Sequence, residues 1–239
     1  MRPSSEASVI ELSRVSCSHP ASDGRVGEAV REICVAFPPR SFNLVTGAFP
    51  GERALLLRLL SLQDAPESGD VLFEGASTRG LDETTRADLR ARRLGLIYAS
   101  PFLLPSLSAI ENIAVPLFKI AHLEPAAVRE RAEAVLDFVG LSGSEQARCG
   151  DLNRYEQHCL TLARALAAEP AVLLVEEIDS TLGSDALPHF AALLRHSIDR
   201  YGVTVIATAS PAYAAGAACR VVDVGNGATD SVLLREPLA

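Results

Sequence analysis

The sequence contains no tryptophan, and only 5% of its residues are aromatic. It has no apolar run close to the roughly 18 residues that a membrane-spanning helix needs, and residues 1–8 lack the apolar core of a secretory signal. The five cysteines are odd in number and scattered, with no C-x-x-C pair, which favours reduced and mostly buried thiols. We therefore expect a cytoplasmic protein.

Basic residues are fewer than acidic ones, 22 against 30, and the formal net charge is −8 at pH 7. This balance argues against nucleic acid as the main partner. It leaves open docking on a membrane protein, which would depend on the local surface.

What the chain does have is 239 residues, 48% of them hydrophobic, which is enough for one large α/β domain or two lobes. Strand and helix patterns alternate along it, which predicts a wound sheet. The predicted strands are 8–15, 29–37, 42–45, 69–73, 94–98, 171–175, 203–207, 221–224 and 231–234. The predicted helices begin near Arg53 and span 82–93, 109–121, 125–139, 157–168 and 186–201. We expect a single domain, 1–239, with an α/β core, 1–81 and 169–239, and an inserted helical subdomain, 82–168.

The stretch 44–60 reads as a strand, a turn with glycines and a leucine-rich helix. A strand that leads into a helix N-terminus presents backbone N–H groups to a phosphate, and the working pattern is G-x-x-x-x-G-K-[ST]. In this frame, Glu52 replaces the second glycine, Arg53 the lysine and Ala54 the hydroxyl residue. The candidate phosphate-binding positions are Gly47, Gly51, Glu52, Arg53, Ala54 and Leu55.

Each departure from the pattern has a chemical cost. Pro50 has no N–H to offer, Glu52 adds a negative charge, and Ala54 cannot ligate Mg²⁺. The planar fork of Arg53 does not fit where a compact ammonium sits. At about 1.5–3 kcal/mol for each lost charge-assisted bond, three losses would weaken phosphate binding about a thousandfold or more. An ordinary strand-turn-helix with no ligand is the alternative interpretation.

The order of these pieces resembles the ATP-binding subunit of ABC transporters, in particular the branch that serves lipoprotein-release, macrolide-export and cell-division complexes. The resemblance covers almost the whole chain, and it is carried by residues 9–12, 68–71 with Gly75, 92–95, 103–105, 111–113, 162–166 and 169–170. It implies a P-loop NTPase-like fold, with a wound sheet core, an N-terminal antiparallel β part and an inserted helical subdomain.

Several positions that act on nucleotide in this family hold other residues here. The adenine-stacking position falls at His19, which could stack weakly or lie on the surface, and the glutamine position falls at Ala99. The histidine position falls at Ser210, which cannot carry a positive charge to the γ-phosphate. The family's Leu-Ser-Gly-Gly-Gln signature is replaced by 152–156, where Asn153, Arg154 and Tyr155 stand. Arg154 could reach a phosphate or stay solvated.

Two acids follow the strand 171–175. Glu177 matches the family's general base, and Glu176 stands where an aspartate would hold Mg²⁺. They are either a working pair or an inherited remnant. In the loop that follows strand 94–98, Phe102, Leu103, Leu104 and Leu107 offer apolar contacts to a partner or pack inward.

The leading hypothesis is a pseudo-ATPase with a degenerate Walker A loop, for which no cofactor is expected. It would act as a scaffold or regulatory partner of a membrane permease at the inner face of the membrane, as a homodimer or as a heterodimer with another ABC subunit. The second hypothesis is an active ATPase that uses ATP and Mg²⁺ with Arg53 and Glu177 to power export or lipoprotein release. The third is a soluble binding protein that reuses the fold.

Overall fold

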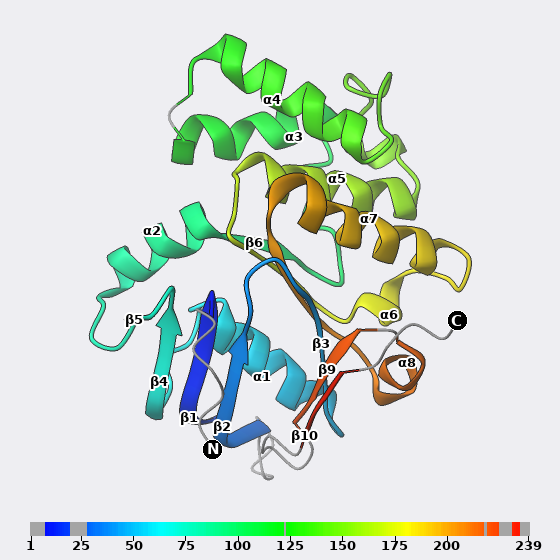
Figure 1. Ribbon diagram of the computed structural model, residues 1–239. Helices are drawn as coiled ribbons and strands as arrows, with labels where there is room; N and C mark the ends of the chain where they lie inside the picture. Colours follow the sequence, from blue (N-terminus) through cyan, green and yellow to red (C-terminus); the bar gives the residue numbers. More distant parts are fainter. Residues whose placement is uncertain (1–7, 20–27, 122, 218, 225–230, 235–239) are drawn as a thin grey trace.

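The computed structural model describes residues 8–19, 28–121, 123–217, 219–224 and 231–234, and its elements are arranged as in Figure 1. The strands are β1 (Ile10–His19), β2 (Glu28–Phe37), β3 (Phe42–Thr46), β4 (Ser68–Phe73), β5 (Ala76–Ser77), β6 (Leu94–Ile97), β7 (Val172–Val175), β8 (Thr204–Thr208), β9 (Arg220–Asp223) and β10 (Ser231–Leu234). The helices are α1 (Pro50–Leu60), α2 (Glu83–Arg93), α3 (Ala109–Pro116), α4 (Pro125–Phe138), α5 (Arg154–Ala167), α6 (Ile178–Thr181), α7 (Ala186–Tyr201) and α8 (Pro211–Gly216). Two short helical turns complete the list, the π turn η1 (Leu117–Ala121) and the 3₁₀ turn η2 (Cys149–Asp151).

Two sheets form the framework of the molecule. A four-stranded antiparallel sheet has the order β2-β1-β4-β5, and a six-stranded sheet has the order β10-β9-β3-β8-β7-β6. In the larger sheet, every pairing from β9 to β6 is parallel, and only β10 runs antiparallel. The mixed α/β architecture and the antiparallel N-terminal part confirm the fold class predicted from the sequence.

The side chains of the parallel sheet alternate between two hydrophobic clusters. Val172 and Leu174 of β7 lie in one cluster with α1 and the antiparallel sheet, and Leu173 and Val175 lie in the other with α3, α4, α5 and α7. This period of two is what a strand buried on both faces requires. Helix α1 is thus enclosed between the two sheets, and α3, α4, α5 and α7 lie on the opposite side of the large sheet (Figure 1).

Boundaries differ from the prediction by more than one residue in β1, which runs over Ile10–His19 where 8–15 was predicted, and in three helices. Helix α1 begins at Pro50 instead of near Arg53, because proline is tolerated in the first turn, where its missing N–H is not needed. Helix α5 begins at Arg154 instead of residue 157, since Asn153 caps it. The predicted helix 109–121 ends as α3 at Pro116 and continues as the π turn η1.

The segment predicted as an inserted helical subdomain, 82–168, contains a strand of the core. β6 pairs with β7 in parallel, with Leu94 opposite Val172, and so forms the edge of the large sheet. The purely helical part of this segment therefore begins after β6, and the division into core and subdomain otherwise stays a prediction. Within the described residues, no helix combines the length and the apolar character that crossing a bilayer would take.

Candidate functional site

The candidate residues on the loops meet at the carboxyl edge of the large sheet. Gly47 lies in the loop after β3, Arg53 lies near the start of α1, and the turn after β7 carries Glu176 and Glu177. Ser210 follows β8, which lies between β3 and β7 in the sheet. The carboxyl ends of adjacent parallel strands are where ligands bind in open α/β sheets. The fold thus brings together residues that are far apart in the sequence.

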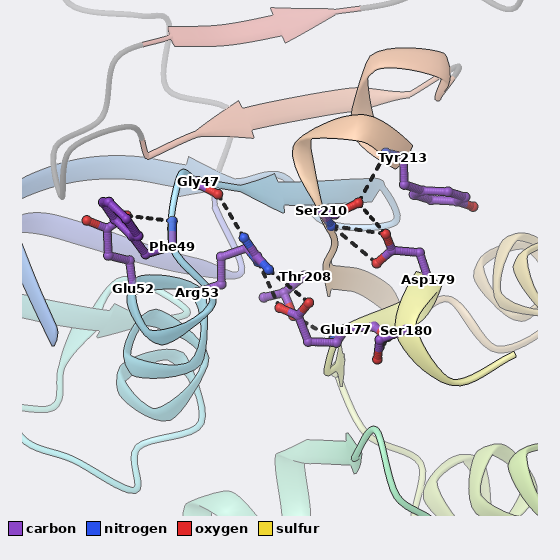
Figure 2. A network of polar contacts seen from close by, with 10 residues as sticks. All are labelled: Gly47, Phe49, Glu52, Arg53, Glu177, Asp179, Ser180, Thr208, Ser210 and Tyr213. Atoms are coloured by element: carbon purple, nitrogen blue, oxygen red, sulfur yellow. Dashed lines mark hydrogen bonds and ion pairs between the residues drawn. The ribbon is translucent and has the colours of Figure 1, made fainter.

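Arg53 is the centre of this arrangement (Figure 2). Its side chain is only 4% exposed, and two of its nitrogens donate to the carboxylate of Glu177, Nε to Oε1 at 2.8 Å and Nη2 to Oε2 at 3.0 Å. The third nitrogen, Nη1, donates to the backbone oxygen of Gly47 at 2.7 Å. The cation that stands in the lysine position is therefore bound to the acid that stands in the general-base position.

Glu177 is also held through its backbone. It adopts a left-handed conformation, with φ 43° and ψ 57°, at the corner between β7 and α6. Its N–H donates to Oγ1 of Thr208 at 2.8 Å, and its carbonyl accepts from Oγ of Ser180 at 2.9 Å. A non-glycine residue in this region needs support from its surroundings, and the two hydroxyls supply it.

Two positions at the start of α1 offer no free backbone donor to an anion. The N–H of Phe49 donates to Oε2 of Glu52 at 3.4 Å, and Pro50 has no N–H. Glu52 is buried in the first turn of α1, the helix end at which the dipole favours an acidic side chain. A phosphate entering here would meet the Glu52 carboxylate and the inward Gly47 oxygen. These two groups carry negative charge or electron pairs toward the position of a phosphate, and neither of them can donate to it.

The candidate metal site has one carboxylate that already accepts a hydrogen bond and one side chain that offers no ligand. Oε2 of Glu176 accepts the backbone N–H of Ala99 at 3.1 Å, and the methyl side chain of Ala54 offers no oxygen ligand. Across the part of the chain that the structure describes, no three His, Cys, Asp or Glu side chains are grouped so that they could hold a metal ion.

Ser210 acts as a helix cap. Its N–H donates to both carboxylate oxygens of Asp179 at 3.2 Å, and its hydroxyl accepts from the N–H of Tyr213 at 3.3 Å at the start of α8. The hydroxyl also donates to Asp179 (Figure 2). The loops after β7 and β8 are thereby joined, and the histidine position contributes no positive charge.

The replaced signature lies at the start of α5. Asn153 and Glu156 form a reciprocal capping box, in which the Asn153 N–H donates to Glu156 at 2.8 Å and the Glu156 N–H donates to Asn153 at 3.0 Å. Arg154 is exposed, and Tyr155 packs partly buried against the core. Burial and the neighbouring Cys159 raise the pKa of Tyr155 to about 12. The side chain of His19, the adenine-stacking position, lies outside the described part of the chain.

The four apolar residues of the loop after β6 divide into two pairs. Phe102 is 65% exposed and Leu104 is 48% exposed, whereas Leu103 and Leu107 are half-buried. Leu104 lines a groove of about 480 Å³ between α2, β6, α3 and α5, together with Val115. The sequence is compatible with a partner-facing and with an inward-packed loop. In the structure, Phe102 and Leu104 are exposed, and Leu103 and Leu107 are half-buried.

Two contributors to this surface were missed from the sequence. Val115 and Phe118 are also exposed, at 37% and 47%, and they stand three residues apart, which is the spacing of one helix face. Arg164 holds the loop in place, because its Nη1 donates to the Phe102 carbonyl at 2.7 Å. Burial lowers the pKa of Arg164.

Comparisons with known proteins agree with the resemblance seen in the sequence. The family model described as ABC transporter matches residues 53–180. The lipoprotein-releasing system ATP-binding protein LolD of Bordetella avium is 34% identical over 184 residues, which are 77% of this chain and 79% of that protein.

Solved structures agree on the fold. The dimeric ATP-binding cassette MJ0796, bound to ADP and Pi, superposes with a TM-score of 0.80 at 20% identity, over 96% of this chain and all of that one. The protein cbiO1 of Clostridium perfringens gives 0.80 at 19% identity, over 96% of this chain and 88% of that one. The wound core with an N-terminal antiparallel part is therefore the fold of ATP-binding cassettes.

Proposed function

This chain belongs to the ABC transporter family as an ATP-binding domain. We propose that it is a transporter subunit that has lost ATP hydrolysis. It serves as a scaffold or regulatory partner of a membrane permease. It lies at the cytoplasmic face of the membrane, as a homodimer or paired with another ABC subunit. The relative from Bordetella avium, named for a lipoprotein-releasing system, supports a partner in the same class of complex.

The ion pair between Arg53 and Glu177 is the observation that carries this proposal. A general base must be free to polarise water, and the loop cation must be free to meet the phosphates. Here each neutralises the other. Separating a buried pair costs about 3–5 kcal/mol, and because the Glu177 side chain is 21% exposed we take the lower end. A nucleotide that displaced Arg53 would thereby lose about a hundredfold in affinity.

The start of α5 supports the same conclusion. Two of its backbone donors are already used, because the Asn153 side chain accepts the Glu156 N–H and the Glu156 side chain accepts the Asn153 N–H. A phosphate of a second subunit would have to compete with this cap, which contributes about 1 kcal/mol to the helix. In a homodimer, both kinds of loop would be altered at each shared site.

The groove beside Leu104 is the surface that we assign to the permease. Phe102 and Phe118 stand exposed near it, and a partner that covered them would bury apolar area at about 25 cal/mol per Å². Because Arg164 fixes the loop through the Phe102 carbonyl, this surface needs no rearrangement before docking.

Two measurements on the full chain test the proposal. We expect no steady phosphate release above that of the Glu177→Gln variant, and no ATP–Mg²⁺ binding at micromolar concentration. We also expect that a pull-down from native membranes recovers a permease, and that Phe102→Asp with Leu104→Asp loses it. Arg129→Asp, which places the same side chain on the exposed face of α4, is the matched control. Phosphate release that Glu177→Gln abolishes would overturn the proposal.

An ATP-hydrolysing subunit is the second candidate, and it is favoured by the place of Glu177, the second residue after the buried strand β7. In that case Arg53 would have to leave Glu177 when nucleotide and Mg²⁺ arrive. This candidate predicts turnover that depends on both residues.

A further inference from the structure

We infer that the loop after β3 and the turn after β7 together form a binding site for a guanidinium group and that Arg53 of the same chain is its resident ligand. The inference deepens the proposed function, on which it rests, because it says what has taken the place of the phosphates. The site belongs to the folded chain and needs no nucleotide to be complete.

The acceptors around Arg53 match the shape of its side chain. Three oxygens converge on the fork: Oε1 and Oε2 of Glu177 and the carbonyl oxygen of Gly47, at 2.8, 3.0 and 2.7 Å from Nε, Nη2 and Nη1. Two parallel bonds to one carboxylate are the arrangement that a planar guanidinium forms and an ammonium cannot. All three oxygens accept, so the site selects a cation with several fixed donors.

The receptor is held by contacts that do not involve Arg53. Gly47 lies close to β9 and the residue after it, since a Cβ added there would come within 3.1 Å of Cγ2 and 3.3 Å of the carbonyl oxygen of Val224. Glu177 is fixed by Thr208 through its N–H and by Ser180 through its carbonyl. The Gly47 oxygen and the backbone of Glu177 should therefore keep their places when the Arg53 side chain is removed, which leaves the carboxylate within reach of a guanidinium ion that enters the site.

Arg53 in this site links parts of the fold that are distant in the sequence. Arg53 stands in the first turn of α1, and Glu177 is 124 residues later, at the corner between β7 and α6. Asp179 then joins the same corner to Ser210 after β8. The loops after three neighbouring strands thus form one polar network (Figure 2).

Chemical rescue of the full-length Arg53→Ala variant tests the inference. Loss of the pair should lower the unfolding temperature by roughly 10 °C. Guanidinium chloride at about 5–20 mM, far below denaturing concentrations, should raise it again in a saturable way, as expected for a site of millimolar affinity. Sodium chloride at equal ionic strength should not do so. The double variant Arg53→Ala with Glu177→Gln should show no rescue, and Arg129→Ala, on the exposed face of α4, should unfold like the wild type.

Each outcome decides the matter. The inference is overturned if guanidinium chloride does not raise the unfolding temperature of Arg53→Ala, or if it raises that of the double variant equally. If Arg53→Ala does not fold, Arg53→Lys is the second variant. Arg53→Lys keeps the positive charge but lacks the planar guanidinium group. An unchanged unfolding temperature of this variant overturns the inference. A lowered unfolding temperature, with faster hydrogen exchange at both 47–52 and 177–181, supports the inference. Phosphate release by the wild type would overturn the proposed function alone, while a failed rescue without phosphate release would overturn this inference alone.

Discussion

Rebuilding the phosphate loop should restore nucleotide binding and should cost stability. The triple variant Glu52→Gly, Arg53→Lys and Ala54→Ser returns the three altered positions to the pattern G-x-x-x-x-G-K-[ST]. It removes the Glu52 carboxylate from the loop, replaces the fork by an ammonium and adds a hydroxyl for Mg²⁺. The changed residues belong to α1, whose apolar face is left as it is, so the variant should fold.

The size of both effects can be worked out from the contacts. Three regained charge-assisted bonds at about 1.5–3 kcal/mol each, discounted because they are not additive, give about 4 kcal/mol. The dissociation constant for ATP–Mg²⁺ should therefore move from about millimolar to about micromolar. Losing the bidentate pair and the Glu52 half of the cap should lower the free energy of unfolding by about 3–4 kcal/mol.

Isothermal titration calorimetry at up to about 1 mM nucleotide covers this range of affinities, and urea unfolding reports the stability. Ala54→Ser alone is the control, because it adds the metal ligand and leaves Arg53 on Glu177. Its affinity should stay close to that of the wild type. A folded triple variant that binds no more tightly than the wild type would refute the reasoning, and so would a wild type that already binds at micromolar concentration.

Three other predictions concern packing, capping and pH. Gly95→Ala should destabilise the protein by about 1–3 kcal/mol in urea unfolding, because its Cβ would lie 2.7 Å from Cδ2 of Leu173, whereas Gly183→Ala, with nothing within 4 Å, is the matched control. Asn153→Ala should lower the unfolding temperature by about 2–4 °C in a thermal scan, since it removes the α5 cap; no change would contradict the capping role. Burial raises the pKa of Cys159 to about 11 from the ordinary 9.0, so the unfolded chain releases this proton first and stability should fall as pH rises from about 9 to 11. Cys159→Ala should flatten that fall in pH-dependent unfolding.

Much of the fold could be predicted because the local pattern and the tertiary structure agree. The amphipathic pattern of 125–139 predicted the buried face of α4, and Val128, Ala132 and Val135 are buried there. The unbroken apolar run before Glu176 predicted a strand that is covered on both faces. The start of α5 could also have been found, since asparagine followed three residues later by glutamate is a capping signal.

The ion pair could not be predicted from the sequence. Arg53 and Glu177 are separated by 124 residues, and comparison with the family pattern assigns each of them a role toward nucleotide, with nothing to indicate that they meet. Their contact depends on the position of β3 relative to β7, with β8 between them. The register of a parallel sheet is set by long-range packing, which local periodicity does not contain. The inward carbonyl of Gly47 is hidden from the sequence for the same reason.

The polar network at the carboxyl edge of the large sheet has a consequence for how this subunit moves relative to its neighbours. In an enzyme whose loops are organised by its substrate, arrival and departure of that substrate drive the stroke. Here side chains of the protein itself hold the loops after β3, β7 and β8 together, through Arg53, Glu177 and Asp179. We therefore expect these three loops to move together, as one rigid unit with the core. Under the proposed function, movement of this core is therefore imposed by the partner subunits and not by nucleotide.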